Sequence, residues 1–154
     1  MKEDCPLRGN CLTKSIVYKA SVTHGQRDTI TKVYFGLAGG TFKERFRNHT
    51  KSFRNEKYQN ETELSKHIWD LKKKGEHYNL KWEIMKKSNL AMRRSGICNL
   101  CLEEKLIITI HKENSLNRRS ELISTCRHKR KKNKEPPDHE MHPLPQPRAP
   151  TKSN

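Results

Sequence analysis

Apolar residues are scarce in this chain, and the places where they gather limit the folds that it can adopt. Only 31% of the 154 residues are hydrophobic, and the mean hydropathy is −1.07, low values for a globular protein. Most of the large apolar side chains fall in the stretches 15–37, 64–71, 80–85 and 97–110. The length fits one domain with a tail, and a core can form only because the apolar residues are concentrated in this way.

The first and third stretches have the alternation of β-strands. Ile16 to Val22 and Ile30 to Leu37 predict two strands, and the Gly-containing turn between them joins the pair as an antiparallel hairpin. Residues 38–40 are expected to end the second strand. Residues 80–85 predict a third, half-buried strand.

Helices are predicted after the hairpin and after the third strand. Thr41 and Glu44 form a capping box, so a helix begins there. Its residues with helical spacing, which should dock on the sheet, are Phe42, Phe46, His49 and Phe53. Asn60 with Glu63 predicts the cap of a second helix, with an apolar side along 64–71.

The last apolar stretch, 97–110, predicts a third helix. Its apolar residues cover most of the circumference, so we expect this helix to be largely buried. Residues 118–125 predict a short helix or strand. We therefore divide the chain into a cysteine-bearing loop (1–14), a folded domain (15–126) and a basic, then proline-rich tail (127–154), which we expect to be disordered.

The positive charge indicates an anionic partner. The formal charge is +16, and residues 127–154 hold eight Lys/Arg and three Asp/Glu, so +11 remains on 1–126. Because the body itself is basic, nucleic acid is the expected partner, ahead of a membrane surface. DNA contacts are expected from basic residues of the first two predicted helices, namely Lys43, Arg47, Lys51 and Lys66.

The sequence also bears on location. No apolar run reaches the roughly 18 residues that cross a bilayer, and the first residues lack the apolar region of a signal peptide. We expect an intracellular, nuclear protein with reduced thiols. The run 127–134, with six Lys/Arg, is a nuclear import signal, a phosphate-binding arm or a solvated charge run.

Several side chains could together supply phosphodiester chemistry, which needs an activated water, a cation for the phosphate and help for the leaving oxygen. Arg45 can pair with a phosphate, and His49, one helical turn on, can move a proton, although both also suit an ordinary core-edge helix. Tyr18 and Tyr34 can position or deprotonate water, or simply pack. The six candidates are Tyr18, Tyr34, Arg45, His49, Glu104 and Asn117.

A carboxylate in the apolar third helix is costly unless it is paired or binds a metal ion. Glu104 and its neighbour Glu103 both qualify, and helical periodicity does not choose between them. Mg²⁺ or Mn²⁺ needs only one or two protein carboxylates together with water and phosphate. One such glutamate is enough for a catalytic divalent ion.

The cysteines form a second group of candidate ligands, for a structural zinc ion. Cys98 and Cys101, at a helix start, have the spacing of a zinc half-site. We prefer Cys5 and Cys11 as the other half, which would clip the N-terminal loop to the third helix. Cys126 with His128 is the rival half-site, and reduced, partly buried thiols are the alternative to any metal.

The order of these motifs resembles the GIY-YIG nuclease superfamily. Ile16-Val17-Tyr18 stands for the first motif and Tyr34-Phe35-Gly36 for the second. Arg45 with His49 resembles the family's helix motif, and Glu104 followed by Asn117 resembles its helix glutamate and terminal asparagine. The spacing from the glutamate to Asn117 favours Glu104 over Glu103. Within this superfamily, the segment from about residue 5 to about residue 130 looks most like the endonuclease domain of Penelope-like retroelements. The segments that carry this closer resemblance begin at Thr41, Thr62, Cys98 and Asn117.

The resemblance implies an α/β fold of the α+β kind, with a three-stranded antiparallel sheet, helices around it and an active site on the hairpin surface. Glu104 would hold one divalent ion, Tyr18 would activate or orient water, and Arg45 would bind the scissile phosphate. Tyr34, His49 and Asn117 would support them. Such a domain nicks DNA to prime reverse transcription, although no reverse transcriptase precedes it in these 154 residues.

Three functions therefore compete. The first is a metal-dependent DNA endonuclease, whether a piece of a retroelement, a decayed copy or a host protein derived from one. The second is a catalytically inactive DNA-binding module on the same fold. The third, a zinc-stabilised RNA-binding protein, is less favoured because only 6% of the residues are aromatic, whereas RNA binding by stacking needs exposed rings.

Overall fold

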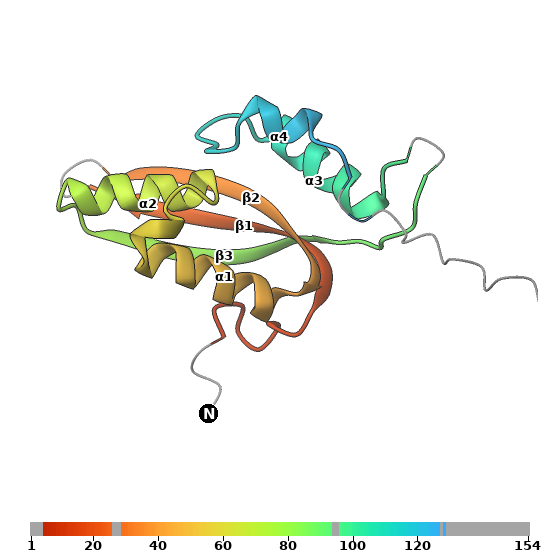
Figure 1. Cartoon of the computed structure of the whole chain (residues 1–154), viewed down its shortest axis with the longest axis horizontal. Helices are drawn as coiled ribbons and strands as arrows, with labels where there is room; N and C mark the ends of the chain where they lie inside the picture. Colours follow the sequence, from red (N-terminus) through yellow and green to blue (C-terminus); the bar gives the residue numbers. More distant parts are fainter. Residues whose placement is uncertain (1–4, 26–28, 94–95, 127, 129–154) are drawn as a thin grey trace, which may run out of the picture.

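The chain has a three-stranded antiparallel sheet with helices packed on both faces, an α+β fold (Figure 1). A computed structural model describes residues 5–25, 29–93, 96–126 and 128, so most of the expected tail lies outside the described residues. The elements are β1 (Lys14–His24), β2 (Ile30–Thr41), α1 (Phe42–Arg54), the 3₁₀ helix η1 (Glu56–Tyr58), α2 (Glu63–Lys73), β3 (Tyr78–Lys87), α3 (Asn99–Ile110) and α4 (Arg119–Ile123).

The predicted hairpin and third strand are confirmed, and all three strands are longer than expected. The strand order is β2-β1-β3, so β1 lies in the middle. Tyr18 pairs with Gly36 of β2 and with Ile84 of β3. The sequence predicted that β2 would end at residues 38–40, but the strand continues to Thr41 because Lys14 of β1 still pairs there.

Helices α1 and α2 cover one face of the sheet. Thr41 and Glu44 form the predicted capping box, with both of its hydrogen bonds present. The predicted cap of α2 was wrong: Thr62, not Asn60, caps this helix, because the Thr62 side chain accepts a hydrogen bond from the backbone N–H of Ser65. We call the core of this side the aromatic layer. Its largest members are Tyr18, Tyr34, Phe42, Phe53, Leu64, Ile68, Leu71 and Trp82.

Helices α3 and α4 cover the opposite face (Figure 1). Val17, whose side chain points away from that of Tyr18 along β1, packs here against Leu100 of α3. The other buried members of this core, which we call the cysteine layer, are Cys98, Cys101 and Cys126. The expectation that the third helix is largely buried was wrong, because its outer side is left exposed at Leu102, Leu106 and Ile110.

The free edge of β2 is covered by the segment that leads from α3 to α4. Val33 N–H donates to Asn114 O, and Leu116 N–H donates to Val33 O. The Asn117 side chain continues this pairing: its Oδ1 accepts from Phe35 N–H and its Nδ2 donates to Phe35 O, both over 2.8 Å. An asparagine suits this position because its amide has the donor and acceptor of a peptide group. Among the described residues, no helix is long and apolar enough to cross a membrane.

Candidate active site and metal centre

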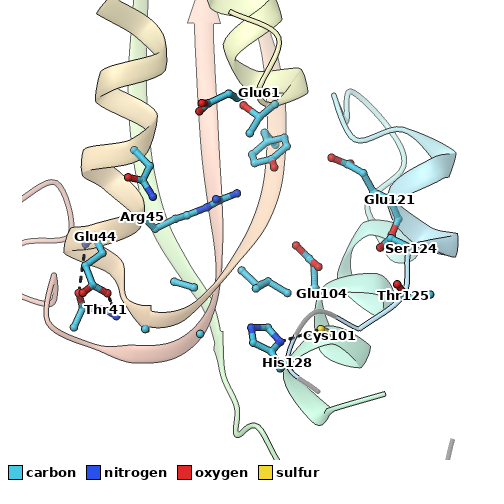
Figure 2. Close-up of a pocket in the computed structure, with 17 residues that line it drawn as sticks. Thr41, Glu44, Arg45, Glu61, Cys101, Glu104, Glu121, Ser124, Thr125 and His128 are labelled. Atoms are coloured by element: carbon cyan, nitrogen blue, oxygen red, sulfur yellow. Dashed lines mark hydrogen bonds between the residues drawn. The ribbon is translucent and has the colours of Figure 1, made fainter. Parts of the chain in front are cut away.

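A cavity of about 380 Å³ opens beside β2, with walls from both helical layers (Figure 2). Arg45 of α1 and Tyr34 of β2 line one side, and Glu104 of α3 and Glu121 of α4 line the other. Its other charged or metal-ligating side chains are Glu44, Glu61, Cys101 and His128. Three of the six side chains predicted for phosphodiester chemistry, Tyr34, Arg45 and Glu104, therefore line one cavity.

Tyr18 lies behind Arg45 and is fully buried at the centre of the sheet. Arg45 Nε–H donates to Tyr18 Oη over 3.1 Å, and the same oxygen lies 2.7 Å from His49 Nε2. The helix brings the two partners to this oxygen because Arg45 and His49 are four residues apart on one face of α1. The Tyr18 hydroxyl thus holds the guanidinium at the cavity wall.

Burial sets the protonation of this network. Burial raises the pKa of Tyr18 to about 12, although the nearby Arg45 charge acts in the opposite direction. Burial, followed by repulsion from Arg45, lowers the pKa of His49 to about 3. At neutral pH, Tyr18 is therefore a neutral phenol and His49 a neutral imidazole, while Arg45 carries the positive charge.

Gly36 lets the two tyrosines come together. A Cβ atom at this position would lie 2.5 Å from Tyr18 Oη and 3.0 Å from Cε1 of the Tyr34 ring. A larger residue would push the Tyr18 hydroxyl away from Arg45, so close approach requires glycine here. Burial raises the pKa of Tyr34 well above its ordinary value, so Tyr34 also stays protonated at the cavity wall.

The structure separates the two glutamates that the sequence left as alternatives. The Glu104 carboxylate points into the cavity, across from Arg45 (Figure 2). Glu103, the next residue on α3, lies with its Oε1 3.9 Å from Lys86 Nζ of β3 and does not line the cavity. Of the two, only Glu104 is placed to act on a group bound beside Arg45.

Glu121 is a cavity residue that sequence reasoning missed. Its Oε2 accepts from Asn117 Nδ2 over 2.7 Å and from the Arg118 N–H over 3.1 Å. Burial raises its pKa, while the hydrogen bonds from Asn117 and Arg118 partly offset this rise. Asn117 itself does not line this cavity; it anchors the strand edge and orients Glu121. The available signal was the four-residue spacing from Asn117 to Glu121.

The side chains predicted to contact DNA divide into two kinds. Lys43, Arg47 and Lys51 are exposed along α1, the helix that carries Arg45, and Lys51 Nζ lies over the Tyr58 ring. Lys66 of α2 is instead tied to Glu63, with Nζ 2.7 Å from its carboxylate. The charges of the three α1 residues are therefore exposed to solvent, although none of the three lines the cavity, whereas the charge of Lys66 is already paired.

A second group of ligand-type side chains lies at one end of the cavity. The sulfur atoms of Cys98, Cys101 and Cys126 and one nitrogen of His128 all lie within 4.8 Å of one another. The three cysteines are buried and His128 is half-buried. The cluster could bind a metal ion such as zinc, and Cys101 and His128 also line the cavity (Figure 2).

The preferred zinc ligand set was wrong in its N-terminal half. Cys5 and Cys11 form a disulfide with each other, so neither sulfur is free to bind zinc. The expectation of reduced thiols therefore fails for this pair among the described residues. The N-terminal loop packs on the aromatic layer, on the side of the sheet away from α3, and the rival half-site of Cys126 and His128 takes its place.

Comparison with known proteins adds no assignment to this geometry. No protein-family model, curated protein or solved structure matches the chain.

Proposed function

We propose that this protein is a metal-dependent DNA endonuclease of the GIY-YIG type, derived from a Penelope-like retroelement and acting on nuclear DNA. The observation that carries the proposal is the cavity in which Arg45 of α1 and Tyr34 of β2 meet Glu104 of α3, which is distant from both in the chain. A cation facing a carboxylate across such a cavity is the pairing needed to bind a phosphate and a divalent ion side by side.

The cavity residues fit a magnesium or manganese ion. Glu104 and Glu121 face the cavity with carboxylate oxygens, the ligands that hard divalent ions prefer, and such ions complete their coordination with water and phosphate. When bound, the ion would supply charge stabilisation and a more acidic water molecule. Asn117 would keep Glu121 in place through the hydrogen bond from its Nδ2 atom.

Arg45 would bind the scissile phosphate. Its Nε–H is engaged by Tyr18 Oη, which leaves the two terminal amino groups for the cavity and for Tyr34. Tyr18, a buried neutral phenol, then acts by holding Arg45 in position. Tyr34, protonated at the cavity wall, can donate a hydrogen bond to a phosphate oxygen. Lys43, Arg47 and Lys51, exposed on α1 outside the cavity, would bind backbone phosphates further along the DNA.

The test is nicking of supercoiled plasmid by purified protein with Mg²⁺ or Mn²⁺. Glu104→Ala and Arg45→Ala should each lose at least about 100-fold in rate, the scale on which transition-state charge stabilisation is lost. Glu103→Ala is the matched control, because this neighbour lies outside the cavity beside Lys86. Equal activity of the Glu104 and Glu103 variants would contradict the proposal.

One observation favours the second candidate, a catalytically inactive DNA-binding module. Tyr18 is fully buried and does not line the cavity, and burial raises its pKa to about 12, so no phenolate stands ready to activate water. DNA binding that weakens with salt, without nicking under either metal ion and unchanged in the Glu104→Ala variant, would support this candidate instead.

A further inference from the structure

The α3–α4 side of the sheet has a core made largely of cysteine. Among the described residues, the buried members of this core are Val17, Leu100 and three cysteines. Met85, Met92, Leu37, Ile97 and Ile107 pack around them while partly exposed. So small an apolar core contributes little to stability by burial alone, since hydrophobic stabilisation scales with the area removed from water. Phe35 and Ile108 are buried as well, outside this cluster, and a metal ion bound by the cysteines would add to the stability that burial provides.

Two nitrogen–sulfur distances in the cluster are close to those of a tetrahedral zinc site. His128 Nδ1 lies 3.3 Å from Cys101 Sγ and 3.5 Å from Cys98 Sγ. Ligands at ordinary zinc distances in a tetrahedron are separated by about 3.6 Å for nitrogen and sulfur and about 3.8 Å for two sulfurs. The two observed nitrogen–sulfur distances are therefore close to the nitrogen–sulfur separation expected around zinc.

Hydrogen bonding alone does not explain this arrangement. A single imidazole nitrogen faces two sulfurs, yet in the neutral ring it carries at most one hydrogen or one lone pair in the ring plane. One ion at the centre satisfies all four atoms together. Cys98, the N-cap of α3, also accepts the Cys101 N–H at its sulfur over 3.4 Å, which would stabilise a thiolate there.

The fourth ligand is seated by the sheet itself. A Cβ atom on Gly39 of β2 would lie 2.7 Å from His128 Nε2, so the imidazole ring rests against the bare backbone of the strand. Cys126 and His128 follow α4, and Cys98 and Cys101 begin α3. An ion held by these four side chains would therefore fasten the start of α3, the end of the α4 segment and β2 together.

We propose that Cys98, Cys101, Cys126 and His128 bind one structural zinc ion, and that this ion fixes the cavity wall that carries Glu104 and Glu121. Glu104 lies three residues after the ligand Cys101, and Glu121 lies five residues before the ligand Cys126. With four protein ligands the site is closed and has no open position for chemistry. The statement about the wall rests on the proposed function, whereas zinc binding does not.

The first experiment measures metal in the purified full-length protein. We expect about one equivalent of zinc, and Co²⁺ in its place should give the intense near-ultraviolet sulfur-to-cobalt band of a tetrahedral thiolate site. Cys126→Ser should lose most of the zinc, whereas Cys5→Ser, with its disulfide outside the cluster, should keep it. Less than about half an equivalent in the unaltered protein would overturn the proposal.

A conservative variant guards against misfolding of the serine variant. His128→Cys replaces the nitrogen ligand with a fourth sulfur, and it should keep about one zinc and strengthen the cobalt band. A His128→Cys protein that is folded by circular dichroism but binds no zinc would contradict ligation at this position. So would an unchanged cobalt band, because it would show that residue 128 is not a ligand.

The second experiment tests the cavity wall by hydrogen exchange. After removal of zinc by a chelator that leaves magnesium free, amides of α3 and α4 should exchange at least about tenfold faster, while those of α1 and α2 stay protected. Unchanged exchange in α3 and α4 would overturn the structural role. If zinc binds and exchange responds but the plasmid is never nicked, the nuclease proposal fails and the zinc proposal stands. If the plasmid is nicked by protein that binds no zinc, the zinc proposal fails and the nuclease proposal stands.

Discussion

The two faces of the sheet are stabilised by different chemistry. On one face, the aromatic layer closes around Tyr18, Phe42 and Trp82, whose rings meet edge to face or tilted at centroid distances between 5.3 and 5.7 Å. On the other face, the cysteine layer buries few large side chains and has three thiols and an imidazole at its centre. Burial of large rings dominates the aromatic layer, whereas the proposed zinc ion would add to the smaller burial in the cysteine layer.

The cavity lies where the two layers meet, and both layers contribute charged side chains to it. The aromatic layer presents the cation, because the guanidinium of Arg45 is held by Tyr18 Oη. The cysteine layer presents the carboxylates of Glu104 and Glu121. The proposed active site is divided between the two layers, so activity would require both layers to be in place.

The largest expected effect is the loss of a ring from the aromatic layer. Phe42→Ala removes a fully buried side chain that contacts both Tyr18 and Trp82, and it should lower the free energy of unfolding by about 3–5 kcal/mol. Urea denaturation followed by circular dichroism measures this change. Phe42→Leu is the control and should recover most of the loss. A cost below about 1 kcal/mol for Phe42→Ala would show that this layer does not depend on its rings.

Two glycines of one strand probe the two layers separately. Gly36 and Gly39 are an odd number of residues apart on β2, so they face opposite layers. Gly36→Ala would press on the Tyr18 hydroxyl and should cost about 1–3 kcal/mol with zinc affinity unchanged. Gly39→Ala would press on His128 and should weaken zinc binding about 10–100-fold with a smaller effect on the aromatic layer.

Gly40→Ala serves as the control for the zinc effect of Gly39→Ala. Its added Cβ atom would lie 2.6 Å from Glu44 Oε2, which accepts the Thr41 N–H in the capping box, so this variant should disturb the start of α1 while zinc affinity stays unchanged. Urea denaturation of the zinc-loaded proteins and competition with a zinc indicator measure the two effects separately. Loss of zinc in Gly36→Ala, or none in Gly39→Ala, would contradict the division into two layers.

Local signals in the sequence predicted much of the aromatic layer. The capping box at Thr41 and the spacing from Phe42 to Phe53 depend on contacts within one helix, so they could be read without the fold. The cap of α2 was misplaced because polar residues crowd the segment before Glu63 and several can accept the same N–H. Which of these polar residues caps α2 depends on the path of the chain between η1 and α2.

The cysteine layer was harder to predict because its contacts are distant in sequence. The spacing of Cys98 and Cys101 predicted one half-site. The other half-site depends on where the segment after α4 runs and on the absence of a side chain at Gly39, and neither can be read from local sequence. Burial of α3 was overestimated because periodicity does not reveal whether a third layer covers the outer side of a helix. Glu121 was missed because a carboxylate in a polar segment looks solvent-exposed until Asn117 is seen beside it.

Acid should act on the aromatic layer through His49. Its pKa is near 6.5 in the unfolded chain and about 3 in the fold. Between these values the unfolded chain binds one more proton, so stability is full above pH 6.5 and falls as the pH drops toward 3, by at most about 1.4 kcal/mol per pH unit. The difference between wild type and His49→Gln should show this slope, while acid release of zinc affects both proteins alike. A difference independent of pH would contradict a buried, neutral His49.

The smallest expected effects concern basic residues on the outer surfaces of α1 and α2. Arg47 is exposed on α1, and Arg47→Ala should reduce the salt dependence of DNA binding by about one counterion. Lys66→Ala is the matched control, because Lys66 Nζ lies 2.7 Å from the Glu63 carboxylate, so its loss should hardly change that slope. Fluorescence anisotropy over a salt series measures both slopes. Equal changes of the salt dependence in the two variants would mean that DNA also contacts α2. The DNA-binding surface would then include the outer sides of both α1 and α2.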